Sequence, residues 1–191
     1  ECEIENASTQ KPIIPGIECV GEIADPSDSG WQVGQKVAAL MGGMGRSFNG
    51  SYAEYALLPV NHVFPVESEL SWTDMAAIPE TYFTAWGSLF QCLRLTKDDK
   101  LLVRGATCSL GYVAIQIAKA YGCTVVGTTH RESKLHLLAE AGCNEYILDD
   151  GDIRGKVSGV TKALELIGIK TVKNTLMSLE QGGVVCNTGV L

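Results

Sequence analysis

The chain has 191 residues, of which 46% are hydrophobic and 19% are charged, and its formal net charge is −7. This composition is ordinary for a folded globular protein and excludes a disordered one. The acidic balance argues against nucleic acid as the main partner, because a phosphate-binding surface needs a basic stripe. No apolar run reaches the roughly 18 residues that a membrane-spanning helix requires, so we expect no such segment.

Seven cysteines are scattered through the chain, at positions 2, 19, 92, 108, 123, 143 and 186. Several lie inside apolar runs, where a free cysteine behaves as a small hydrophobic residue. No two of them form the Cys-x-x-Cys pair that is typical of zinc ribbons and thioredoxin-like sites. We therefore interpret them as reduced structural thiols and expect a cytoplasmic protein.

The first third of the chain alternates short β-like runs with turns. The predicted strands cover residues 18–24, 35–40 and 51–59, and the glycine-rich stretch Gly42–Gly45 is one of the turns between them. This texture indicates a small, irregular β domain. From Ser71 to Leu95 the pattern becomes helical, and Pro79 should divide it into two pieces.

From residue 100 onward, strand and helix alternate. Helical periodicity covers 110–121 and 132–141, and each run is followed by a glycine that is typical of a helix C-terminus, Gly122 and Gly142. This rhythm predicts an α/β fold with a doubly wound parallel sheet. The predicted strands of that sheet cover 100–104, 124–129, 145–149, 163–167 and 184–188.

Two features indicate that the sheet is incomplete. The stretch between the third and fourth strands is too short and too glycine-rich for a full crossover helix. The last strand of a six-stranded sheet is also missing. We therefore expect the chain to be a fragment or to lack segments.

The segment 101–111, Leu-Leu-Val-Arg-Gly-Ala-Thr-Cys-Ser-Leu-Gly, runs from a buried strand through small residues directly into a helix. Such a turn lets a pyrophosphate approach the N–H groups at the helix N-terminus, where the helix dipole favours an anion. Gly105 would permit the tight turn, and Gly111 would let the helix pack closely on the sheet. The full Gly-x-Gly-x-x-Gly motif is absent, so the alternative is a close-packed turn without a ligand.

The end of the second strand indicates which nucleotide would bind. NAD-specific folds tend to carry an acidic residue there, which holds the ribose 2′-hydroxyl. Here the strand ends in Thr-Thr-His-Arg at 128–131, and Lys134 follows. The hydroxyl of Thr128 and the cations of Arg131 and Lys134 suit a 2′-phosphate, so we predict NADPH. The alternative is a solvated loop without a ligand.

Five separated motifs resemble, in the expected order, landmarks of the medium-chain dehydrogenase/reductase superfamily. They are Pro15–Gly21, Gly34–Val37, Gly50–Tyr55, Thr81–Trp86 and Gly105–Gly111. The resemblance implies a doubly wound parallel Rossmann sheet with an N-terminal GroES-like β domain. It divides the chain into a GroES-like catalytic domain at 1–80, with its N-terminal part missing, and a Rossmann NADP-binding domain at 81–191, with its C-terminal part missing.

The same comparison separates the zinc and zinc-free branches of the family. Zinc alcohol dehydrogenases carry Gly-His-Glu where this chain has Gly16-Ile17-Glu18, and isoleucine cannot bind a metal. The four closely spaced cysteines of the structural-zinc lobe have no counterpart, and Cys2 with Glu3 is a superficial imitation of a ligand pair. The chain therefore resembles the zinc-free quinone oxidoreductase branch, and we expect no metal site.

The resemblance also implies which residues contact the coenzyme, whose nicotinamide would lie between the two domains, and that the protein is a homodimer joined through its Rossmann domains. The implied contacts are Thr84, Asn187 and Thr188 near the nicotinamide, Gly168 on the ribose side, and Ser109 and Leu110 facing the pyrophosphate.

These residues predict an NADPH-dependent oxidoreductase that transfers hydride to a quinone or an α,β-unsaturated carbonyl. Without a metal, the developing negative charge needs a hydrogen-bond donor, and Tyr52 is the candidate, the alternative being a half-buried strand tyrosine. Quinone oxidoreductases often carry tyrosines near the start of the catalytic domain, whereas residues 3–10 contain none. Two alternatives stay open: a non-catalytic NADPH-binding sensor or structural module, and another user of the Rossmann fold such as a methyltransferase.

Overall fold

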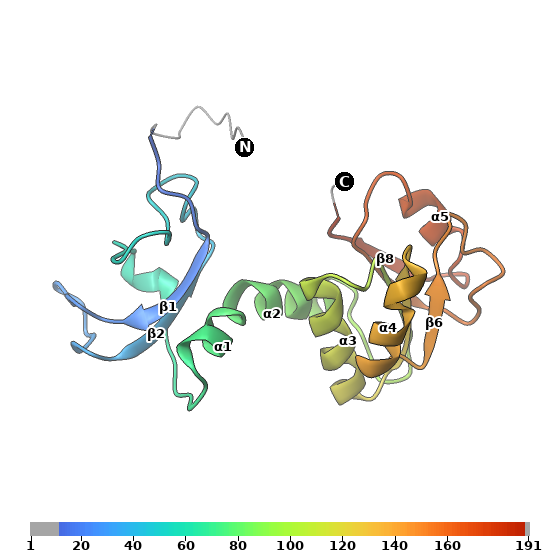
Figure 1. Cartoon of the computed structure of the whole chain (residues 1–191), viewed down its shortest axis with the longest axis horizontal. Coiled ribbons are helices and arrows are strands. Elements are labelled where there is room, and N and C mark those ends of the chain that lie inside the picture. Colours follow the sequence, from blue (N-terminus) through green and yellow to red (C-terminus); the bar gives the residue numbers. More distant parts are fainter. Residues whose placement is uncertain (1–11, 190–191) are drawn as a thin grey trace. The chain divides into compact units, whose positions relative to one another are not determined.

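A computed structural model describes residues 12–189 and shows two compact units, Glu1–Glu80 and Thr81–Leu191. Both units are drawn in Figure 1, coloured along the sequence. The boundary between them falls inside helix α2 (Pro79–Trp86). In the described part of the chain, no helix has the length and apolar character needed to cross a membrane.

The first unit contains a small antiparallel sheet in the order β1-β2-β3. Its strands are β1 (Glu18–Glu22), β2 (Lys36–Leu40) and β3 (Val63–Pro65), and a 3-10 turn, η1 (Val60–His62), leads into β3. The strands predicted over 18–24 and 35–40 are therefore present with slightly shorter bounds.

The prediction of a strand over residues 51–59 is wrong, because these residues form no strand. The N–H of Ser51 donates to the carbonyl of Gly16 at 3.3 Å and that of Tyr52 to Pro15 at 3.0 Å, but no ladder continues beyond them. A strand needs a neighbour to satisfy its backbone groups, and no described segment supplies one here. The alternation of side chains that suggested a strand leaves Tyr55 and Leu57 exposed instead.

Two helices follow the small sheet. Ser71 caps α1 (Trp72–Ala76) by accepting a hydrogen bond from the N–H of Asp74 at 3.1 Å. Helix α2 begins at Pro79, where the absent N–H of proline costs nothing, so the predicted division at this residue is confirmed. It continues into η2 (Gly87–Cys92), a π-helix, which is a rare form found mostly where function constrains the backbone.

The second unit is built on a parallel sheet of five strands in the order β6-β5-β4-β7-β8. This is the strand order of a doubly wound dinucleotide-binding sheet. Its first three strands are added in one direction from β4, and the next two are added on the other side of β4. The fold class predicted from the sequence is confirmed. The strands are β4 (Lys100–Arg104), β5 (Thr124–Thr129), β6 (Glu145–Leu148), β7 (Lys162–Glu165) and β8 (Val184–Asn187).

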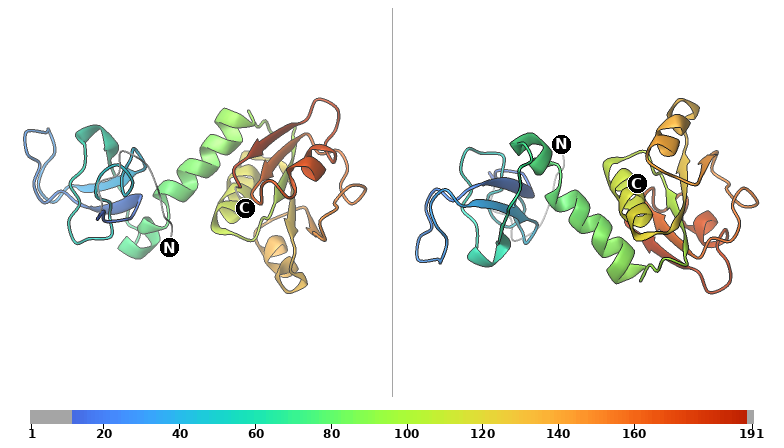
Figure 2. Two further views of the ribbon diagram at one scale, coloured as in Figure 1. Left: turned by 90° about the horizontal axis from the view of Figure 1, so that it is seen from above. Right: turned by 90° about the horizontal axis from the view of Figure 1, so that it is seen from below.

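Helices cover the sheet where they connect its strands (Figure 2). Helix α3 (Ser109–Tyr121) packs on β4 and β5, α4 (Leu135–Glu140) packs on β5 and β6, and α5 (Val172–Leu176) packs on β7 and β8. The helix predicted over 132–141 begins as the 3-10 turn η3 (Glu132–Lys134). Gly122 closes α3 with a φ of 101°, a left-handed conformation that favours glycine.

The connection from β6 to β7 contains no helix, as its length predicted. Ile153, Val157 and Val160 lie on it and are buried against one face of the sheet. They pack with Leu102 and Val126, whose side chains project from β4 and β5. An irregular segment therefore takes the place of a crossover helix while still excluding water from the core.

Candidate coenzyme-binding site

The carboxyl ends of all five strands lie at one edge of the parallel sheet. The chain leaves β4 toward β5 on one side, and β7 lies on the other side, so the topological switch point lies between β4 and β7. Doubly wound sheets bind their ligands at such a point. Two turns meet there, because a Cβ added to Gly105 after β4 would lie 3.0 Å from Cγ1 of Ile167 after β7.

Two glycines shape the turn from β4 into α3. Gly105 has a φ of 79°, and its N–H donates to Oγ1 of Thr128 at 3.1 Å. Gly111 lies so close to the strand end that an added Cβ would overlap the Ala106 carbonyl. Cys108 caps α3, because its Sγ accepts the Gly111 N–H at 3.4 Å. The two glycines therefore have the structural roles that the sequence predicted.

The two residues expected to face a pyrophosphate differ in their surroundings. Ser109 is exposed at the first position of α3. Leu110 is half-buried, and its side chain packs against the core of the second unit. An anion at this helix N-terminus could therefore meet the Ser109 side chain, but it could meet Leu110 only through the backbone.

Thr128 requires a correction. Its side chain is fully buried, its Oγ1 accepts the Gly105 N–H, and the same hydroxyl donates to Oδ2 of Asp149 at 3.4 Å. Both functions of the hydroxyl are used inside the sheet, so it is not available to a phosphate. The residue holds the turn in place instead.

The cations expected at a 2′-phosphate lie directly after β5. Arg131 is exposed, its N–H donates to Oγ1 of Thr129 at 3.3 Å, and its Nε donates to Nε2 of His130 at 3.2 Å. Lys134 is half-buried at the end of η3. The backbone of Arg131 is therefore held at the end of β5, the strand next to β4, while the side chain of Arg131 is exposed to solvent.

The ends of β7 and β8 carry the residues expected near the ribose and the nicotinamide. Gly168 is buried with a φ of 114°. Asn187 is exposed, and Oγ1 of Thr188 lies 3.3 Å from Oγ of Ser88 in η2. Thr84 is half-buried on α2, four residues before Ser88. The π-helix is thus linked to the strand end where the nicotinamide is expected.

A buried ion pair beneath this edge was not foreseen from the sequence. Arg104, the last residue of β4, has no exposed surface, and its Nε and Nη2 donate to the two carboxylate oxygens of Asp149 at 2.7 and 3.0 Å. Its Nη1 donates to Oδ1 of Asn174 at 2.8 Å and to Oγ1 of Thr175 at 3.0 Å. This bidentate pair ties the end of β4 to the residue that follows β6 and to α5.

Glu165 forms the second half of the same buried network. Its Oε1 accepts the N–H groups of Ile167 and Gly168 at 2.9 and 3.2 Å and the hydroxyl of Thr171 at 3.0 Å. Its Oε2 accepts the hydroxyl of Thr175, which also receives a hydrogen bond from Arg104. The network therefore fixes the two turns that flank the switch point, one after β4 and one after β7.

The pKa of Asp149 reflects this network. Burial alone would raise it, but the hydrogen bond from Arg104, the Gly151 N–H, the positive charge of Arg104 and the Thr128 hydroxyl outweigh burial and hold the pKa below its usual value. Asp149 is therefore ionised at neutral pH, as its pairing with a buried guanidinium requires.

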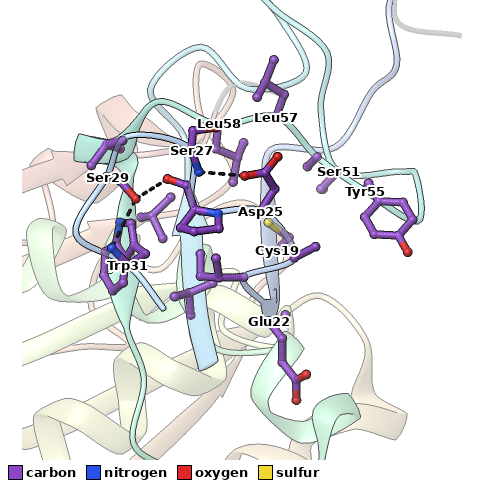
Figure 3. A pocket seen from close by; sticks show the side chains of 18 of the residues that line it. Cys19, Glu22, Asp25, Ser27, Ser29, Trp31, Ser51, Tyr55, Leu57 and Leu58 are labelled. Atoms are coloured by element: carbon purple, nitrogen blue, oxygen red, sulfur yellow. Dashed lines mark hydrogen bonds between the residues drawn. The ribbon is translucent and has the colours of Figure 1, made fainter. Parts of the chain in front are cut away.

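The first unit contains a cavity of about 490 Å³ beside β1 (Figure 3). Figure 3 shows Cys19 and Glu22 of β1, the loop from Asp25 to Trp31, and the segment from Ser51 to Leu58 around it. None of the expected coenzyme contacts lines this cavity.

Tyr52 is not among the residues that line this cavity. It lies in a loop with 77% of its surface exposed, so the alternative interpretation of a half-buried strand tyrosine is wrong.

Ile17, which stands where the resemblance places a zinc ligand, is half-buried. The neighbouring Glu18 accepts the N–H of Glu80, in the first turn of α2, at 2.8 Å. Among residues 12–189 no group of three histidine, cysteine or acidic side chains is arranged to hold a metal ion. Cys2 and the tyrosine-free stretch 3–10 lie outside the described residues.

Two family models match the chain. The alcohol dehydrogenase GroES-like domain matches residues 2–68, and the zinc-binding dehydrogenase domain matches residues 109–191. The N-terminal unit is therefore GroES-like, and the C-terminal unit matches the domain of the zinc-binding dehydrogenases. The chain is built on the plan of the alcohol dehydrogenase-like proteins.

Individual relatives agree with this plan. Quinone oxidoreductase from Rattus norvegicus is 30% identical over 187 residues, covering 93% of this chain and 55% of the rat protein. The YhdH oxidoreductase from Salmonella enterica in complex with NADP superposes with a TM-score of 0.80 at 25% identity, covering 92% of this chain and 56% of that one. A structure described as an NAD-dependent alcohol dehydrogenase superposes with a TM-score of 0.82 at 26% identity, covering 92% and 60%.

The chain belongs to the medium-chain dehydrogenase/reductase superfamily, in its quinone oxidoreductase-like branch. It spans about half the length of the relatives that it matches. The similar structures include both an NADP complex and an NAD-dependent enzyme, so the choice between the two coenzymes has to be argued from the residues of this chain.

Proposed function

We propose that the protein is an NADPH-dependent oxidoreductase that transfers hydride to a quinone or an α,β-unsaturated carbonyl without zinc. The observation that carries the proposal is the glycine turn at the switch point with two cations directly after β5. The relatives named quinone oxidoreductase and the NADP complex of the Salmonella protein support it. The assignment of 1–80 as the catalytic domain and 81–191 as the NADP-binding domain is part of the same proposal.

The residues of the second unit fit the coenzyme. Gly111 lets α3 pack against the end of β4, because an added Cβ would overlap the Ala106 carbonyl. The N–H groups at the N-terminus of α3, beside Ser109 and Leu110, would bind the pyrophosphate. Arg131 and Lys134 would bind the 2′-phosphate, because guanidinium and ammonium groups donate to phosphate oxygens.

The remaining contacts concern the nicotinamide and the substrate. The nicotinamide supplies the hydride when it is bound, and the protein orients it and excludes water. Thr84, Asn187 and Thr188 would hold the nicotinamide side and Gly168 the ribose side. We assign Tyr52 as the hydrogen-bond donor to the substrate oxygen, where negative charge develops.

Zinc is not part of this proposal, because Ile17 stands where the zinc enzymes carry a histidine ligand. We further propose a cytoplasmic homodimer. Its association through the nucleotide-binding units follows from the family resemblance.

The coenzyme preference is tested by thermal-shift titration of the full-length protein with NADPH and with NADH. A ligand that binds only the folded state raises stability by RT ln(1 + [L]/Kd), so a preference appears as a larger shift. Arg131→Ala should weaken NADPH binding about 10- to 100-fold, because a hydrogen bond to a charged group contributes roughly 1.5–3 kcal/mol.

Two comparisons make this test specific. NADH binding should be unchanged in Arg131→Ala, and Lys173→Ala, which removes an exposed cation of α5, should leave NADPH binding unchanged. Equal shifts with both coenzymes in the unmodified protein would contradict the NADPH assignment.

The alternative is a non-catalytic NADPH-binding sensor or structural module with the same fold. NADPH oxidation by the full-length protein in the presence of a small quinone would exclude it. Tyr52→Phe, which removes only an exposed hydroxyl, should lower kcat while leaving the NADPH Kd unchanged.

A further inference from the structure

One residue holds the beginning of the turn from β4 into α3 at two points. The N–H of Gly105 donates to Oγ1 of Thr128 at 3.1 Å, and the N–H of Ala106 donates to the carbonyl oxygen of Thr128 at 2.9 Å. Thr128 is the fifth residue of β5 and has no exposed surface. The beginning of the turn is therefore anchored to the neighbouring strand.

The far end of the turn is held as well, whereas the N–H groups between the two ends are not. Cys108 accepts the Gly111 N–H through its Sγ at 3.4 Å and the Tyr112 N–H through its carbonyl oxygen at 3.0 Å. In the part of the chain that the structure describes, none of the N–H groups of residues 107–110 donates to a protein acceptor. These consecutive donors are the ones left for an anion at the N-terminus of α3.

Asp149 sets the direction of the Thr128 hydroxyl. Its carboxylate accepts hydrogen bonds from Nε and Nη2 of Arg104 at 2.7 and 3.0 Å and from the N–H of Gly151 at 2.9 Å. Because an ionised carboxylate can only accept, the Thr128 hydroxyl gives its proton to Asp149, at 3.4 Å, and turns a lone pair toward the Gly105 N–H. The buried ion pair thus reaches the turn through one hydroxyl group.

We propose that Thr128 is a positioning residue for the coenzyme, acting through the N–H groups of the turn. Its hydroxyl and carbonyl fix the first two of these groups, so that the free N–H groups that follow keep the direction in which they bind the pyrophosphate. The inference rests on the coenzyme function proposed above. Because NADPH and NADH share the pyrophosphate, loss of the hydroxyl should weaken the binding of both coenzymes by the same factor.

The test measures the Kd of NADPH and the Kd of NADH for the full-length protein by isothermal titration calorimetry. Thr128→Val keeps the shape of the side chain but removes the hydroxyl, and both Kd values should rise about tenfold, because the Gly105 N–H loses its acceptor. Thr128→Ser keeps the hydroxyl and should bind both coenzymes as the unmodified protein does. Arg131→Ala, by contrast, should weaken the binding of NADPH alone.

Two controls separate positioning from stability. Val126→Ala opens a cavity on the same face of β5, two residues before Thr128, so it should destabilise the protein and leave both Kd values unchanged. Thr128→Ser and Thr128→Ala differ by the hydroxyl alone, and their Kd values should differ by the same factor even if valine prevents folding.

The outcomes distinguish this inference from the proposed function. Unchanged Kd values in Thr128→Val or Thr128→Ala, a loss confined to NADPH, or an equal loss in Val126→Ala would overturn the role of Thr128 and leave the coenzyme assignment intact. An unmodified protein that binds neither NADPH nor NADH would overturn both.

Discussion

Gly111 is the residue whose replacement most directly probes the coenzyme turn. A Cβ in Gly111→Ala would overlap the Ala106 carbonyl and lie 2.7 Å from the Ala106 Cα. Because these are backbone atoms at the end of a buried strand, the helix must shift, and we expect a loss of about 1–3 kcal/mol in the free energy of unfolding. Urea denaturation measures this loss, and a coenzyme titration should show weaker NADPH binding.

The matched control for this substitution is Gly87→Ala. Gly87 lies in the helical segment of the same unit, and no atom lies within 4 Å of the position of its added Cβ. Alanine there should be neutral or slightly stabilising, because glycine is a poor helix former. A Gly111→Ala protein as stable as the control, with unchanged NADPH binding, would refute the close-approach argument.

At the residue level, the sequence predicted the turn better than it predicted the direction of individual side chains. Gly105 and Gly111 have the roles expected of them, since backbone geometry demands glycine at both positions. Thr128 could not be placed correctly, because its hydroxyl points into the sheet and the partner that uses it, Asp149, lies 21 residues further along the chain. Arg104 was a missed signal: a charged residue that ends a run of buried apolar residues needs a buried partner.

At the level of elements, removing one partner of the buried Arg104–Asp149 pair should cost more stability than breaking an exposed ion pair. Arg104→Met leaves a buried carboxylate without its partner, and we expect a loss of about 3–5 kcal/mol. Arg154→Met breaks the pair with Asp152, whose side chain is 51% exposed, and should change stability little, because solvent screens an exposed ion pair. Urea denaturation of the two variants measures the difference, and equal losses would contradict it.

The same pair predicts how stability depends on pH. The pKa of Asp149 is lowered in the folded state, so its contribution is present above the unfolded value of about 4 and is lost as the pH falls through the lower folded value. In the unmodified protein, the free energy of unfolding should therefore decrease as the pH is lowered below about 4. Asp149→Asn should flatten this slope, and an unchanged slope would show that other carboxylates account for it.

The strands differ in how well the sequence predicted them. The strands of the parallel sheet were predicted closely, because each buried strand is rich in β-branched or aliphatic residues and most end at a glycine or a polar turn. The segment 51–59 shows the same kind of alternation but forms no strand, because a strand also needs a partner, which local sequence does not encode.

At the level of the whole molecule, the metal content separates the two branches of the superfamily. We expect metal analysis of the purified full-length protein to find well under one zinc per chain, because Ile17 replaces the histidine ligand. The same measurement on Ile17→His, which restores that histidine, tests whether the neighbouring residues can hold zinc once the histidine is present. Stoichiometric zinc in the unmodified protein would show that other residues complete a site and would remove the zinc-free assignment.

The strand order of the second unit also has a consequence for how the protein folds during synthesis. The antiparallel sheet of the first unit joins neighbours in the sequence, and all three of its strands are synthesised before β4. β4 has to wait for one of its two partners, because Leu101 pairs with Lys162 and about half of the unit is translated in between. Since contacts between distant residues form slowly, β4 keeps one edge unpaired throughout this interval. That edge is the part of the nascent chain that a chaperone would need to protect.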